Sequence, residues 1–311
     1  MCCLFGLIDY RGTLTARQKN RILSIMAATC EARGTDATGI AYNSHGRLRI
    51  YKRPIPGHWM RFNVPGDARA IMGHTRMMTQ GSAEKNYNNH PFHGSGKNGP
   101  FALAHNGVIY NDDVLRRTHL LPKTNIETDS FIGVQLIEQM KTLSFDSLRY
   151  MAEQLRGSFT FTVLDANDDL YVIKGDNPMC LYHFPVLGLY LYASTETILK
   201  QALYQMRLPS KKPVPIPMDC GDILKIDSGG KLMWSHFNDS NLFFQWYAPA
   251  HARTCADSCR KKPLSVADST YFGALKDVAL AFGYAPEDID KLAGQGFTPE
   301  EIEEFLYCGE V

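Results

Sequence analysis

The 311-residue sequence predicts an α+β fold of layered sheets and helices, followed by a small helical appendage. Three observations favour it. Short apolar segments with the character of strands occur both early and late in residues 1–245. Two amphipathic helical patterns separate these two groups of strands. Residues 246–311 contain instead two similar helix-start patterns, 13 residues apart.

The early segments begin with a buried strand expected at 3–9, where the sequence CLFGLID is almost entirely apolar. A helix is expected within 12–34, because apolar residues recur there on one face at helical spacing. Strands are expected at 38–44 and 47–53, joined by a Ser-His-Gly connection, and again at 69–75.

A polar stretch at 78–100 is expected to be a long loop. Loops of this length inside compact domains are commonly functional. The loop ends at FALAHNGVIYN, residues 101–111, which predicts a strand broken by an Asn-Gly turn.

Helices are expected at 128–143 and 145–155, the first with Thr128 as its N-cap and Asp129 in its opening turn. Short strands then recur, interrupted by one more helix. The strands are expected at 157–165, 170–175, 179–184, 188–194 and 221–226, and the helix at 195–206.

Residues 246–311 are expected to be a linker and a small appendage of three helices. GYAPEDIDKL and GFTPEEIEEF each place Pro at a first helical position, followed by acids that suit a helix N-terminus. Residues 269–282 supply the third helical pattern. An appendage of this size is too small to be a second catalytic domain.

Composition argues against several classes of function. The net charge is +1 and basic residues are scattered, so neither nucleic acid nor an anionic membrane is an expected partner. The weakly polar stretch 179–193 is too short to span a bilayer and contains Pro185 and Gly188. Because no basic segment precedes the apolar N-terminus, we expect no secretory signal and a cytoplasmic protein.

A cytoplasmic location implies that the eight cysteines are reduced. No CxxC pair is present. His251, Cys255 and Cys259 have helical i, i+4, i+8 spacing, which is compatible with a zinc site. Small side chains on one helix face or in a loop explain the same spacing more simply, so neither a metal nor a cofactor is expected.

Each local motif in the sequence is weak evidence by itself, but five sequence blocks taken together are more specific. They are MCCLFG, RGTDATGIAY, GHTRMMTQGSAEKNYNNHPF, LAHNGVIYN and ETDSF. In this order they resemble the glutaminase domain of class II glutamine amidotransferases, which are N-terminal-nucleophile hydrolases. The blocks look closer to glucosamine-6-phosphate synthase and phosphoribosylpyrophosphate amidotransferase than to asparagine synthetases. The resemblance implies a four-layer αββα sandwich over residues 1–245.

The resemblance assigns the reaction to Cys2 as an N-terminal nucleophile. Removal of Met1 would leave Cys2 with a free α-amine, whose pKa near 8 lets it act as the base for its own thiol. Cys3 is expected to point to the opposite face of the strand and to pack, although the family usually has glycine there. Asn106 and Gly107 match the residues that bind the oxyanion.

The resemblance also assigns the residues that hold the substrate. Arg76 matches the arginine that binds the substrate α-carboxylate, and Asp129 the acid that pairs with the α-ammonium. Thr79 matches a substrate-contacting threonine, Arg33 an arginine that orders the site around the N-terminus, and His90 a residue of the loop that closes over glutamine.

Three functions follow as hypotheses. The leading one is hydrolysis of L-glutamine to glutamate and ammonia, with ammonia passed to a separate synthase or synthetase subunit. In the enzymes that the sequence resembles, an aromatic residue commonly follows the matching arginine and takes part in gating the path of ammonia. Here Met77 follows Arg76, so the sequence does not support channelling of ammonia in the same way. The second is an amidohydrolase for another γ-glutamyl compound. The third is a non-catalytic module that senses glutamine or scaffolds partners, and the sequence leaves a homo-oligomer open.

Overall fold

The computed structural model describes residues 2–78, 80–208, 213–243, 275–276, 285–295 and 302. The chain divides into two compact units, Met1–Ala248 and Pro249–Val311. Among the described residues, no helix combines the length and the apolar character needed to cross a membrane.

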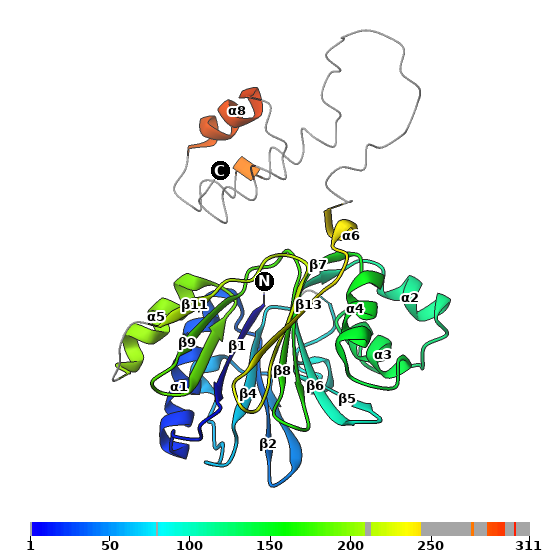
Figure 1. Cartoon of the computed structure of the whole chain (residues 1–311). Helices are drawn as coiled ribbons and strands as arrows, with labels where there is room; N and C mark the ends of the chain where they lie inside the picture. The colour runs from blue at the N-terminus through cyan, green and yellow to red at the C-terminus, as the bar shows by residue number, and fades with distance from the viewer. Residues whose placement is uncertain are drawn as a thin grey trace. The chain divides into compact units, whose positions relative to one another are not determined.

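The first unit is built on two antiparallel sheets (Figure 1). One sheet runs, from edge to edge, β11 (Val214–Ile216), β9 (Cys180–Phe184), β10 (Leu189–Ala193), β1 (Cys3–Asp9), β4 (Ala70–Arg76), β2 (Ala37–Ser44), β3 (Arg47–Arg53). The other runs β13 (Leu232–His236), β12 (Asp222–Ile226), β8 (Leu170–Lys174), β7 (Gly157–Asp165), β6 (Gly99–Ile109), β5 (Phe92–Gly96).

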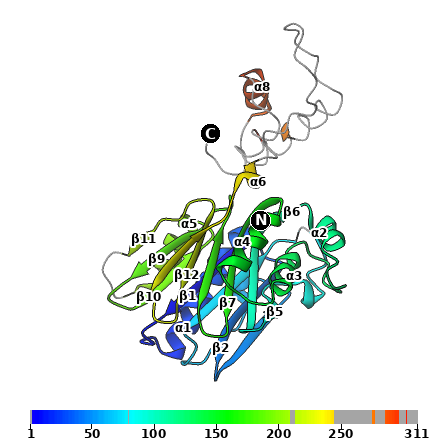
Figure 2. The same cartoon turned by 45° about the vertical axis from the view of Figure 1, so that its right-hand side comes forward.

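Helices cover the outer face of each sheet (Figures 1 and 2). The β1 sheet is covered by α1 (Ala16–Cys30) and α5 (Glu196–Met206), and the β6 sheet by α3 (Phe131–Gln139) and α4 (Phe145–Gln154). The remaining short helices are α2 (Asp112–Thr118), α6 (Ser240–Phe243) and the 3₁₀ turns η1 (Glu31–Arg33), η2 (Gly57–Trp59) and η3 (Asn86–Asn88).

Three apolar cores separate the four layers. One lies between the β1 sheet and α1 with α5, a second between the two sheets, and a third between the β6 sheet and α3 with α4. Strand β1 shows the alternation that produces them, because Phe5 and Leu7 face the helices whereas Leu4 and Ile8 face the other sheet. The predicted four-layer αββα arrangement is confirmed.

The prediction of a long loop at 78–100 is partly wrong, because this segment contains strand β5, which pairs with β6. The sequence of β5, FHGSG, has few residues with strand propensity. The strand forms through close packing instead: a Cβ added at Gly94 would lie 2.3 Å from the Phe101 ring. Only glycine lets that ring cover the backbone at this position.

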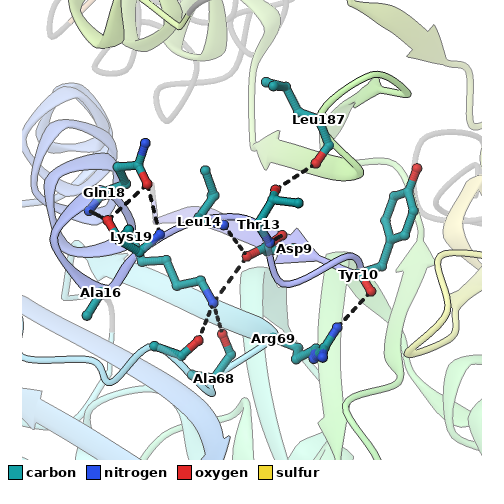
Figure 3. Close-up of polar contacts among 12 residues, drawn as sticks. Asp9, Tyr10, Thr13, Leu14, Ala16, Gln18, Lys19, Ala68, Arg69 and Leu187 are labelled. Atoms are coloured by element: carbon teal, nitrogen blue, oxygen red, sulfur yellow. Dashed lines mark hydrogen bonds and ion pairs between the residues drawn. The ribbon is translucent and has the colours of Figure 1, made fainter.

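A buried ion pair fixes the end of β1 to the start of α1 (Figure 3). Lys19 Nζ lies 3.2 Å from Asp9 Oδ2, and both side chains are fully buried. Lys19 Nζ also donates to the carbonyl oxygens of Gly66 and Ala68, at 2.8 and 2.7 Å. Asp9 accepts from the backbone N–H groups of residues 13 and 14, each at 3.0 Å. All polar groups of the pair that need partners therefore have them.

The second unit contains α8 (Pro286–Gln295), which starts at the predicted proline with Glu287 and Asp288 in its first turn. Leu275, Ile289 and Ile302 are buried. The other two helices predicted for this appendage lie largely outside the described residues, as do His251, Cys255 and Cys259.

Candidate active site

Cys2 lies at the start of β1, immediately before the strand enters the sheet between β10 and β4. The thiol is partly buried and donates to the carbonyl oxygen of Met77 at 3.5 Å. Burial raises the pKa of Cys2, while the Arg76 charge lowers it and the Asp129 charge raises it. The thiol is therefore within electrostatic reach of one positive and one negative side chain.

Arg33, at the end of η1, donates from Nε to the Cys2 carbonyl oxygen at 3.0 Å. The next residue, Cys3, is fully buried in the core that contains α1. The two thiols occupy different environments, because Cys2 is only partly buried whereas Cys3 is enclosed in the core. The predicted packing position of Cys3 agrees with this placement.

Arg76 ends β4 and is almost completely buried. Its guanidinium donates to Asn89 Oδ1 at 2.7 Å, to the Gly81 carbonyl at 3.0 Å and to the Gln80 carbonyl. Burial lowers the pKa of Arg76, and the charges of Cys2 and Asp129 oppose that shift. The loop that follows β4 thus holds the guanidinium in a fixed orientation beside the thiol.

Asp129 lies in the turn before α3 and is also buried. Its Oδ2 accepts from the Ile109 N–H at 2.7 Å, and its Oδ1 accepts from the Ser130 hydroxyl at 3.2 Å. The prediction of Thr128 as N-cap is wrong, because α3 starts at Phe131 and Ser130 holds the cap position. Asp129 binds the end of β6 rather than the first turn of the helix.

Asn106 and Gly107 lie within β6, paired with Thr160 and Phe159 of β7. The predicted Asn-Gly turn is wrong, because the strand runs through both residues without interruption. Gly107 has a φ of 140°, and a Cβ there would lie 1.9 Å from the Ser158 carbonyl oxygen. Glycine is therefore required here for two reasons, the positive φ and the close approach of the β7 backbone, and not because the chain forms a hairpin turn.

The side chain of Asn106 is fully buried, and neither of its amide atoms has a hydrogen-bond partner among the described residues. A buried amide without partners costs about 1 to 3 kcal/mol. Such an orphaned group in a native fold indicates a strained or functional position.

His90 lies just before β5, buried between two rings: 4.1 Å from the His74 ring and 4.4 Å from the Phe92 ring. Within the described ranges, neither of its ring nitrogens has a hydrogen-bond partner. Burial, followed by the nearby His74, lowers the pKa of His90 well below its ordinary value. A neutral ring packed against a tilted His74 ring and edge-to-face with Phe92 suits support of the surrounding loop.

The buried histidines predict a loss of stability in acid. Burial lowers the pKa of His74 from 6.5 to about 3, and it also lowers the pKa of His90 well below 6.5. Between these values the unfolded chain binds more protons than the native one, so the free energy of unfolding should fall as pH drops below 6.5. Each neutral histidine contributes a slope of up to about 1.4 kcal/mol per pH unit.

Urea unfolding at pH 7.5, 6.0 and 5.0 checks this prediction. The free energy of unfolding of the variant His90→Phe should fall less steeply with decreasing pH than that of the wild type, because phenylalanine binds no proton in either the folded or the unfolded state. The exposed His45 provides the matched control, as His45→Gln should keep the full slope. Identical slopes for wild type and His90→Phe would contradict the assignment.

Three residues that support the site were not assigned a role from the sequence. Asn89 holds Arg76 and donates to the Ala83 carbonyl at 2.7 Å. Lys52 of β3 donates to the carbonyl oxygens of Asn89 and Pro91, and burial lowers its pKa to about 8. Ser130 bonds Asp129. Asn89 and Ser130 stand inside the quoted blocks, whereas nothing in the sequence marks Lys52.

The charges of Arg76 and Asp129 thus both act on the Cys2 thiol, and Arg33 donates to the Cys2 carbonyl oxygen. Thr79 lies outside the described residues. In the part of the chain that the structure describes, no group of three or more metal-ligating side chains is close enough to hold a metal ion.

Residues 74–201 match the family model described as a glutamine amidotransferase domain. Among curated proteins, the glutamine–fructose-6-phosphate aminotransferase [isomerizing] of Bacillus anthracis is 31% identical over 182 residues, which are 56% of this chain and 29% of that protein. The enzyme of the same name from Listeria innocua is 32% identical over 183 residues, covering 57% and 30%. The matched region therefore spans less than a third of the length of these relatives.

Among solved structures, glutamine phosphoribosylpyrophosphate (PRPP) amidotransferase from B. subtilis, complexed with ADP and GMP, superimposes with a TM-score of 0.61 at 19% identity. The match covers 76% of this chain and 49% of that one. It shows the N-terminal-nucleophile hydrolase fold, with two antiparallel sheets between flanking helices. Sequence and fold agree: residues 74–201 match a glutamine amidotransferase domain, and the chain is similar in sequence to glutamine–fructose-6-phosphate aminotransferases and in fold to PRPP amidotransferase.

Proposed function

We propose that this domain hydrolyses the side-chain amide of L-glutamine to glutamate and ammonia through a thioester on Cys2. The observation that carries the proposal is that the Cys2 thiol donates to the carbonyl oxygen of Met77, the residue after Arg76, and that the charges of both Arg76 and Asp129 act on it. An amino-acid zwitterion needs one cation for its carboxylate and one anion for its ammonium. A thiol near both charges is placed to attack the side chain of an amino acid that they hold.

The proposed chemistry starts with Met1 removed, so that the Cys2 α-amine is free to accept the thiol proton. The sulfur attacks the amide carbon, a C–S bond forms, and the carbonyl π electrons move onto oxygen. Asn106 and the Gly107 N–H are the proposed donors to that oxyanion. When the tetrahedral species collapses, the C–N bond breaks and the amine's proton leaves with ammonia.

Water then attacks the γ-glutamyl thioester, breaking the C–S bond and releasing glutamate with a regenerated thiol. Arg76 and Asp129 hold the two ends of the amino acid throughout both steps. We further propose that the ammonia acceptor is a synthase or synthetase site on a partner protein. The curated relatives support this only by analogy, since they extend well beyond the region they share with this chain.

One preparation tests the proposal by intact mass and glutamate release, with and without a diazo-ketone analogue of glutamine. Loss of Met1, one adduct on Cys2 and glutamate formation would support it. A retained Met1 without adduct or glutamate would refute it and favour a binding module. Adduct formation without release of glutamate from glutamine would instead point to another γ-glutamyl amide, for which free glutamine should compete.

Asn106→Ala should lower kcat by about 10² to 10³ and change KM much less, because an oxyanion donor acts mainly in the transition state. Steady-state ammonia release measures both constants. Asn98→Ala is a matched control. Asn98 lies in the turn between β5 and β6 and hydrogen-bonds to the backbone of Leu143, so its substitution should leave kcat unchanged. An effect of Asn106→Ala confined to KM would remove Asn106 from the oxyanion role.

A further inference from the structure

A chain of three buried polar side chains runs from β6 to the turn before α3. His105 Nδ1 lies 2.8 Å from the Ser130 hydroxyl oxygen, and that hydroxyl lies 3.2 Å from Asp129 Oδ1. The His105 ring is stacked on Phe161 with centroids 4.5 Å apart and planes 20° apart. All three polar residues are at most 4% exposed.

The direction of these hydrogen bonds follows from the donors available. An ionised Asp129 can only accept, so the Ser130 hydroxyl has to donate its single proton if it is to stabilise the carboxylate. The hydroxyl oxygen is then free to accept from His105 Nδ1–H. A buried carboxylate that lost this donor would keep only the Ile109 N–H as its hydrogen-bond partner among the described residues.

The two donors also fix the orientation of the carboxylate. The Ile109 N–H binds Oδ2 and the Ser130 hydroxyl binds Oδ1, so rotation of the Asp129 side chain would break at least one charge-assisted bond. Ser130 itself is held by the His105 ring, which cannot turn without losing its stack on Phe161.

We propose that Ser130, oriented by His105, is a positioning residue that makes the site selective for substrates with an α-ammonium group. The proposal rests on the proposed function, since it takes Asp129 as the partner of that ammonium. Ser130 does not touch the reacting amide. It acts through Asp129, and its loss should therefore affect one end of the substrate only.

The test compares L-glutamine with 4-carbamoylbutanoate, which has the same amide and carboxylate but no α-amine. Ammonia release gives kcat/KM for each, and the analogue is also measured as a competitive inhibitor of glutamine hydrolysis. A hydrogen bond to a charged group corresponds to roughly 10- to 100-fold in affinity. Ser130→Ala should raise the KM for glutamine by about tenfold with little change in kcat, and should affect the analogue far less.

Two further variants separate positioning from a general structural role. Ser130→Thr keeps the hydroxyl and should restore most of the preference for glutamine over the analogue. His105→Phe keeps an aromatic ring on Phe161 but removes Nδ1–H, and should reduce the same preference by a smaller factor. Circular dichroism and the urea unfolding midpoint show whether each variant is folded, without depending on recognition of the α-ammonium.

Equal losses for glutamine and the analogue in Ser130→Ala, or an unchanged preference for glutamine, would overturn the inference while the proposed function stands. A wild-type protein that releases no ammonia from glutamine would overturn the proposed function and this inference with it.

Discussion

Replacing Cys2 by alanine is expected to reduce glutamate release to background and to abolish labelling by the diazo-ketone. The alanine variant keeps Arg76, Asp129 and Asn106 but has no atom that can form the thioester. Removing the nucleophile of a covalent hydrolase costs on the order of 10⁶ in kcat. Single-turnover glutamate release and intact mass measure the two effects on one preparation.

Cys3→Ala is the matched control, since it removes a neighbouring thiol from the same strand. Cys3 is fully buried on the helix-covered face, so its loss should cost stability in the core and leave turnover nearly intact. Equal losses of activity in the two variants, at equal folding, would show that the nucleophile is misassigned. Labelling of Cys2→Ala at any other cysteine would lead to the same conclusion.

The contrast between Cys2 and Cys3 shows how far a strand pattern can take a prediction. Alternation of side chains along the start of the strand was enough to predict that Cys3 packs, and the structure places Cys3 in the helix-covered core. Alternation could not show that the residue after β4 supplies the oxygen that accepts from the Cys2 thiol. That contact joins residues 75 positions apart and depends on the pairing of β1 with β4.

The elements with strong apolar periodicity were predictable, and the weakly patterned ones were not. Strands β7 and β10 are continuous apolar or β-branched runs, and both appear where the sequence predicts them. Strand β5 has no such pattern and forms because β6 pairs with it and Phe101 packs over Gly94. Strand β13, at the far edge of the same sheet, was missed for the same reason.

Residues of the site were predictable where family motifs mark them, but their supporting contacts were not. The quoted blocks contain Arg76 and Asp129, yet give no sign that Asn89 holds the first and the Ile109 N–H the second. The Asn-Gly pair suggested a turn because that dipeptide favours hairpins. The actual requirement at Gly107 is steric and comes from Ser158 on the neighbouring strand.

Replacing Lys19 by methionine is expected to lower the free energy of unfolding by about 3 to 5 kcal/mol. Methionine fills a similar volume, so the loss arises from charge and hydrogen bonding rather than from a cavity. It leaves the Asp9 carboxylate buried without a cation and deprives the carbonyls of Gly66 and Ala68 of the Lys19 donor. Urea unfolding followed by circular dichroism measures the difference.

Lys200→Ala is the control for removal of a lysine from an exposed ion pair. Lys200 pairs with Glu196 one turn away on α5 and is 63% exposed, so its loss should cost no more than about 0.5 kcal/mol.

Adding Asp9→Asn to Lys19→Met should recover part of the larger loss of stability, because the double variant has no unpaired buried charge. Recovery should be incomplete, since Lys19 also anchors the backbone at 66–68. Equal costs for Lys19→Met and Lys200→Ala would show that the buried pair does not anchor β1 to α1.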